Sequence, residues 1–139
     1  MASPVTPGTE LRLILVEDNA VFRRAVEAHL MRHRRWTIVA SVDNGDDALP
    51  TIRRTPADVV LLDISLPGMN GFQIAEGIRS IPNAPAVVFL TLHDSNPYRE
   101  QARELGAAGF VTKDQFVARL MPLLDVIAAQ QRAPARSTP

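Results

Sequence analysis

The polar residues that could carry chemistry each follow directly on an apolar run of the sequence. They are Glu17, Asp18, Asp63, Thr91 and Lys113. Carboxylates brought together repel one another unless a cation compensates, and oxygen-rich sites of this kind suit Mg²⁺. A lysine and a hydroxyl beside them are groups that can hold a phosphoryl oxygen. These residue types predict phosphoryl transfer to or from a carboxylate, with Asp63 as the nucleophile.

Apolar runs that alternate with helical patterns must position these residues. Residues 59–62 (VVLL) stop abruptly on Asp63 and predict a strand buried on both faces, as in a parallel sheet. Similar runs predict four more strands, at residues 11–16, 36–42, 86–91 and 109–112. Between and after the strands, capping residues and apolar periodicity predict helices at about residues 19–31, 46–49, 71–80, 96–105 and 114–128.

Five strands that alternate with five helices predict an α/β fold with a doubly wound parallel sheet and right-handed crossovers. The carboxyl ends of parallel strands share one edge of the sheet, so the five polar residues should converge there. Two prolines complicate the helices. Pro50 weakens the case for the short helix at 46–49, and Pro122 should kink or split the last helix.

The composition is that of one globular domain. Residues 1–10 read as a flexible leader, 11–129 as the folded domain, and 130–139 as a disordered tail or a linker remnant. The absence of cysteine excludes a disulfide scaffold and fits a cytoplasmic protein. No apolar run has the length of a membrane span, and a net charge of zero gives no general indication of nucleic-acid binding.

Several motifs resemble the receiver domain of two-component response regulators. They are Glu17-Asp18, Asp63 followed by residues 66–71 (LPGMNG), Thr91, and residues 109–113 (GFVTK). The resemblance covers about residues 11–128. Residues 91–94 (TLHD) and 106–114 (GAAGFVTKD) are most similar to receivers that precede LuxR-type helix-turn-helix domains. The resemblance implies a flavodoxin-like (βα)5 fold with strand order 2-1-3-4-5.

The resemblance also implies a role for each site residue. Asp63 would accept a phosphoryl group from a histidine kinase or a phosphotransfer protein. The Mg²⁺ ligands would be Asp18, Asp63 and the Ser65 backbone carbonyl, with Glu17 acting through water. Thr91 and Lys113 would contact the phosphoryl oxygens. The protein would be a phosphoacceptor that takes part in its own phosphorylation and dephosphorylation, rather than an enzyme.

By the same resemblance, Phe110 would occupy the position of the aromatic switch residue, whose side chain changes burial as Thr91 moves. It has no hydroxyl to form a hydrogen bond, so we expect its inactive position to be weakly held. The output surface would be formed by the fourth helix, the fifth strand and the fifth helix. The receiver and its tail take up the 139 residues. We therefore expect the partner to be a separate output protein or a second copy, with no direct contact to nucleic acid or membrane.

The chain departs from common receiver patterns at two positions. Lys113 is followed by Asp114 rather than proline, so a cis peptide bond should not be assumed there. Leu92 is bulky where small residues are frequent and could narrow access to Asp63.

Two alternatives remain open. One is a pseudo-receiver, an interaction module that never takes phosphate, although retention of all five site residues argues against it. The other is a phosphohydrolase with an aspartyl nucleophile. Such enzymes generally need a second acid two residues after the nucleophile, where this sequence has Ser65.

Overall fold

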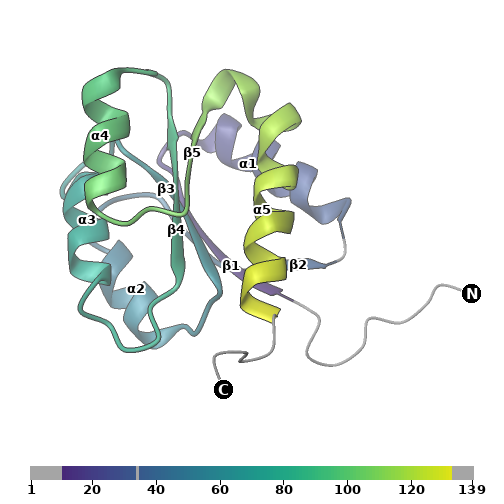
Figure 1. Ribbon diagram of the computed structural model, residues 1–139, viewed down its shortest axis with the longest axis horizontal. Helices are drawn as coiled ribbons and strands as arrows, with labels where there is room; N and C mark the ends of the chain where they lie inside the picture. The colour runs from purple at the N-terminus through teal and green to yellow at the C-terminus, as the bar shows by residue number, and fades with distance from the viewer. Residues whose placement is uncertain (1–10, 34, 133–139) are drawn as a thin grey trace, which may run out of the picture.

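The computed structural model describes residues 11–33 and 35–132, and it contains the predicted parallel sheet (Figure 1). The strands are β1 (Leu11–Val16), β2 (Trp36–Val42), β3 (Val59–Asp63), β4 (Ala86–Thr91) and β5 (Gly109–Thr112). They lie in the order β2-β1-β3-β4-β5, with every neighbouring pair parallel. All five strands have the predicted bounds, and the fold class and strand order are confirmed.

Helices cover both faces of the sheet. They are α1 (Ala20–Met31), α2 (Ala48–Arg54), α3 (Gly71–Ile78), α4 (Asn96–Glu104) and α5 (Phe116–Arg132). Helices α1 and α5 pack on one face, and α2, α3 and α4 pack on the other (Figure 1). Successive side chains of β3 alternate between the two layers, and its four apolar residues are fully buried. An unbroken apolar run is therefore what this central strand requires.

The two prolines are accommodated for different reasons. Pro50 is the third residue of α2, where a backbone N–H would have no partner within the helix, so the helix continues to Arg54. Pro122 lies within α5, yet α5 is one continuous helix and the predicted split is wrong. Leu120 and Leu124, both fully buried, hold the segments on either side of Pro122 against the sheet.

Helix α5 also differs from the prediction at both ends. A 3-10 turn over Lys113–Gln115 precedes it, so Asp114 lies inside that turn and does not cap the helix. At its other end α5 reaches Arg132, so residues 130–132 are helical instead of part of a disordered tail. The expected leader (1–10) and the remainder of the tail (133–139) lie outside the described residues.

A glycine contact fixes the loop that follows β3. The Gly45 N–H donates a hydrogen bond to the carbonyl of Pro67 at 2.9 Å. A Cβ atom added to Gly45 would lie 1.7 Å from the backbone oxygen of Met69. The turn after β2 therefore packs directly on the backbone of the loop that leads away from Asp63, and only glycine leaves room for this approach.

We predict that Gly45→Ala destabilises the fold by about 1–3 kcal/mol, because a rigid backbone segment must move to make room for the methyl group. Urea denaturation measures the loss. The matched control is Gly77→Ala in α3, whose Cβ would meet only the end of the flexible Leu49 side chain. Equal losses in the two variants would contradict the proposed rigidity of this contact.

Candidate functional site

Three carboxylates meet at the carboxyl edge of the sheet. Glu17 and Asp18 follow β1, and Asp63 ends the neighbouring strand β3, which pairs with β1 up to Val16↔Leu62. One carboxylate oxygen from each residue lies within 4.8 Å of the others. Glu17 and Asp63 are buried, whereas Asp18 is exposed. The sheet topology thus brings together acidic residues that are 45 positions apart in the sequence.

The Lys113 ammonium lies between the two buried carboxylates. Its Nζ is 2.9 Å from Oε1 of Glu17 and 3.1 Å from Oδ2 of Asp63. The same ammonium lies 4.8 Å from the centre of the Phe22 ring on α1. Because the Lys113 side chain is itself largely buried, solvent screens these contacts only weakly. One positive charge therefore faces three negative ones.

Burial of these charges perturbs their protonation. Burial, and then the negative charge of Glu17, raises the pKa of Asp63 from 3.8 to about 6, although Lys113 and the Ser65 N–H oppose the rise. For Lys113, burial favours the neutral form, but hydrogen bonding to Glu17 and attraction to Asp63 outweigh it, and the pKa is raised. The site thus holds a charged Lys113 beside Asp63, whose raised pKa favours the protonated carboxyl.

The backbone around Asp63 orients its carboxylate. The Ser65 N–H donates a hydrogen bond to Oδ1 of Asp63 at 3.1 Å. Gly71, the first residue of α3, packs so closely on the end of β3 that a Cβ there would lie 2.4 Å from the Asp63 carbonyl oxygen. An Asn70–Gln73 capping box fixes the start of α3. The turn after β3 is therefore held at both ends.

Thr91 lies at the end of β4, beside β3, and is 2% exposed. Its hydroxyl donates to the His93 carbonyl oxygen at 3.2 Å and accepts from the His93 N–H at 3.0 Å. The hydroxyl is thus paired with the loop that follows the strand, instead of with the acidic cluster. Leu92, in that loop, is 74% exposed and lines a hollow with Phe110 and Arg99 that includes no residue of the acidic cluster.

Phe110, on β5, is half-buried and pairs in register with Phe89 of β4. The Arg99 guanidinium carbon lies 4.6 Å from the centre of its ring. The ring therefore has a specific contact on one face, in addition to apolar packing. Analysis of the sequence missed this arginine, and it also missed Arg23, which donates a hydrogen bond to the Glu17 carbonyl oxygen at 2.9 Å. The positions of both long side chains depend on neighbours that are distant in sequence.

The donor set fits a divalent cation. One lysine does not neutralise three carboxylates, and hard oxygen donors are those that Mg²⁺ prefers. Asp18 and Ser65 both line one open pocket at this edge of the sheet. The peptide bond between Lys113 and Asp114 is trans.

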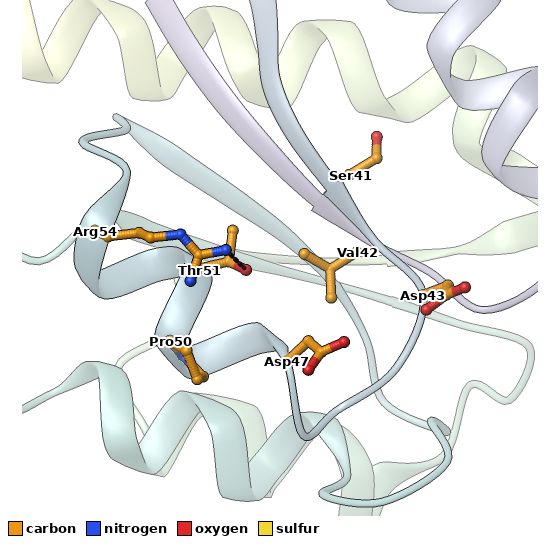
Figure 2. Close-up of a pocket in the computed structure, with 7 residues that line it drawn as sticks. All are labelled: Ser41, Val42, Asp43, Asp47, Pro50, Thr51 and Arg54. Carbon is orange, nitrogen blue, oxygen red and sulfur yellow. Dashed lines mark hydrogen bonds between the residues drawn. The ribbon is translucent and has the colours of Figure 1, made fainter.

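A separate hollow lies between β2 and α2 (Figure 2). It has a volume of about 420 Å³ and is lined by Ser41, Val42, Asp43, Asp47, Pro50, Thr51 and Arg54. The Arg54 guanidinium donates a hydrogen bond to the Thr51 hydroxyl at 3.3 Å (Figure 2). None of these lining residues belongs to the acidic cluster, so this hollow is distinct from the site.

Comparison with known proteins agrees with this geometry. The family model for the response regulator receiver domain matches residues 13–125. This chain belongs to that family. The match confirms the family that the motifs around Glu17-Asp18, Asp63, Thr91 and Lys113 resemble, the phosphorylation-dependent signalling module of two-component regulators. Among the described residues, no helix is both long enough and apolar enough to cross a membrane.

The proteins that resemble this chain include transcriptional response regulators. "Probable transcriptional regulatory protein NarL" of Mycobacterium tuberculosis is 35% identical over 105 residues, which are 76% of this chain and 49% of that protein. The solved signal receiver domain of NarL from that species has a TM-score of 0.78 at 33% identity, with 85% of this chain and 96% of that domain covered. A LuxR-family response regulator from Aurantimonas sp. SI85-9A1 has a TM-score of 0.81 at 29% identity, with 87% of this chain and 86% of that chain covered. The chain spans about half the length of the curated NarL relative.

The raised pKa of Asp63 gives a testable dependence of stability on pH. The folded state favours the protonated carboxyl, so this contribution to stability is complete below pH 3.8 and is lost as the pH rises through about 6. We predict that Asp63→Asn, measured without divalent cations, stabilises the protein at pH 7.5 by up to about 3 kcal/mol. At pH 3.5 the difference should vanish.

Urea denaturation at the two pH values measures this difference, and Asp114→Asn is the control because Asp114 is exposed in the turn after β5. A lower stability of the Asp63 variant at pH 7.5 would show that the contact with Lys113 outweighs the cost of burying the charge.

Proposed function

We propose that Asp63 accepts a phosphoryl group from a histidine kinase or a phosphotransfer protein. The observation that carries this proposal is the contact between the Lys113 ammonium and Asp63 Oδ2, beside two further carboxylates at the open edge of the sheet. In the reaction a carboxylate oxygen of Asp63 bonds to phosphorus while the bond from phosphorus to the donor's imidazole nitrogen breaks. The products are an acyl phosphate on Asp63 and the free donor histidine.

We assign the Mg²⁺ ligands to Asp18, Asp63 and the Ser65 backbone carbonyl, with Glu17 acting through water. When bound, Mg²⁺ neutralises charge on the phosphoryl oxygens. The protein's own residues supply the rest of the site. The Ser65 N–H holds Oδ1 of Asp63, and Lys113 provides a fixed positive charge where phosphoryl oxygens accumulate negative charge.

The arrangement favours a phosphoacceptor over a phosphohydrolase. The position two residues after Asp63, where a phosphohydrolase would carry its second acid, is Ser65, whose backbone N–H is used to hold the nucleophile. Lys113, in turn, has a short ion pair to Asp63 and would supply the positive charge that an incoming phosphoryl group needs. We propose a cytoplasmic location, where a histidine kinase or phosphotransfer protein would reach the site.

The signal would leave through Thr91 and Phe110. A phosphoryl group on Asp63 offers oxygens that compete with the His93 backbone for the Thr91 hydroxyl. Movement of Thr91 changes the space beside Phe110, because β4 and β5 are paired neighbours. The surface formed by α4, β5 and α5 would then bind an output protein or a second copy of the chain.

Phosphorylation tests the assignment of Asp63. With Mg²⁺ and a small donor such as acetyl phosphate, intact-mass spectrometry should detect one added phosphoryl group that is stable in acid and labile in base. Asp63→Asn should abolish the addition, because no carboxylate oxygen remains at that position, whereas Asp114→Asn should retain it. Equal labelling of the Asp63 variant would disprove the assignment.

Binding of Mg²⁺ should be detectable without phosphate. A ligand at about 100 times its Kd stabilises the folded state by about 2.7 kcal/mol, so added Mg²⁺ should raise the melting temperature by several degrees. Asp18→Asn should remove most of that rise. Asp43→Asn, which alters an exposed carboxylate after β2 and outside the cluster, is the control. An undiminished rise in the Asp18 variant would place the ion elsewhere.

A further inference from the structure

Arg99 is held over Phe110 by a second residue. Its guanidinium makes a two-pronged contact with Asp94, from Nε to Oδ1 at 2.5 Å and from an Nη atom to Oδ2 at 3.1 Å. Such a forked pair fixes the plane of the guanidinium as well as its position. The same guanidinium covers the face of the Phe110 ring at 4.6 Å, within the range of a cation–π contact.

Asp94, which anchors Arg99, lies in the same loop as His93, whose backbone binds the Thr91 hydroxyl. The loop after β4 runs from Thr91 through His93, whose backbone binds the hydroxyl, directly to Asp94. Ser95 then caps α4, the helix that carries Arg99. The contacts form a continuous chain from the Thr91 hydroxyl through the loop, the Asp94 carboxylate and the Arg99 guanidinium to the Phe110 ring on the next strand.

We propose that Asp94 and Arg99 form a clamp that holds Phe110 in its position in the unphosphorylated protein. This proposal rests on the proposed function, in which a phosphoryl group on Asp63 attracts the Thr91 hydroxyl. When that hydroxyl leaves the His93 backbone, the loop loses two of its hydrogen bonds, and Asp94 is free to move with it. The guanidinium then loses its anchor, and the Phe110 ring is released.

The clamp changes the expectation for Phe110. A phenylalanine cannot form the hydrogen bond that a hydroxyl would provide, yet the guanidinium gives this ring a directional contact. Arg99 and Asp94 are both about half exposed, with side-chain exposures of 44% and 51%, so the ion pair by itself contributes little. The ion pair orients the guanidinium. The oriented guanidinium then changes the free-energy difference between two positions of Phe110. Arg99 and Asp94 are therefore positioning residues.

The clamp predicts that its removal favours the phosphorylated arrangement. A ligand that binds only one of two conformations binds more tightly when the other loses a stabilising contact. Loss of an exposed cation–π contact corresponds to about two- to fivefold in that equilibrium. Arg99→Gln and Asp94→Asn should thus lower by this factor the half-saturating concentration of beryllofluoride, a phosphoryl mimic, in the presence of Mg²⁺. Arg99→Lys, which keeps a cation but loses the fork, should have a smaller effect.

Calorimetry measures the affinity, and NMR of carbon-13-labelled phenylalanine measures the position of the Phe110 ring in the free protein. In Arg99→Gln the ring signals should shift toward their positions in the beryllofluoride complex. Arg103→Gln is the matched control, since Arg103 forms an ion pair with Glu100 on the same helix, and its guanidinium has no such contact with Phe110. The control should change neither readout.

Each outcome has a distinct meaning. If the wild-type chain fails to bind beryllofluoride with Mg²⁺, the proposed function itself is wrong. If the wild-type chain binds it, but Arg99→Gln leaves both the half-saturating concentration and the Phe110 signals unchanged, only the clamp is wrong. Equal effects of Arg99→Gln and Arg103→Gln would also overturn the clamp, because they would reflect the overall charge of α4.

Discussion

The ion pair of Lys113 with Glu17 and Asp63 is the interaction on which the site depends. Two carboxylates are buried at the ends of neighbouring strands, and a single ammonium from the loop after β5 lies within 3.1 Å of both. A buried carboxylate without such a partner would cost several kcal/mol. Even with this partner, the pKa of Asp63 stays high, at about 6. The site therefore has an excess of negative charge at buried positions, and a divalent cation would offset it.

The sheet and the loops at its carboxyl edge hold the acidic cluster in place. The β3 strand is fully buried on both faces and delivers Asp63 to the edge, while close glycine contacts hold the loop that follows it. Gly71 packs on the end of β3, and Gly45 packs on the next part of the loop. The loop after β4 is held differently, by two hydrogen bonds between the Thr91 hydroxyl and the His93 backbone. One side of the site is thus fixed by packing, and the other by bonds that a competing oxygen can break.

The difference between the packed loop after β3 and the hydrogen-bonded loop after β4 would suit the proposed signalling switch. In the proposed function, the tightly packed backbone would keep Asp63 in place through repeated phosphorylation, whereas the Thr91 hydroxyl, held only by its own loop, could exchange hydrogen-bond partners. Such an exchange would reach β5 because β4 and β5 are neighbours in the sheet, and Phe110 pairs with Phe89 at that junction. The Arg99 guanidinium, anchored by Asp94, adds a directional contact on the outer side. The same short loop therefore binds the Thr91 hydroxyl through His93 and, through Asp94, the guanidinium that covers the Phe110 ring.

The strands and the candidate site residues could be predicted from the sequence, because each is marked by a short apolar run and the polar residue that ends it. The run before Asp63 identifies a doubly buried strand, and the polar residues that end the strands can converge only where a parallel sheet brings its carboxyl edges together. The consequences of Pro50 and Pro122 could not be predicted in this way. Whether a proline disrupts a helix depends on where the helix begins and on what packs beside it. Arg99 likewise could not be assigned to Phe110 from sequence, because the position of a long side chain is set by neighbours from other elements. Local patterning of apolar and polar residues determined the strands and the candidate chemistry; only tertiary packing decided which charges touch, because those contacts join residues far apart in the chain.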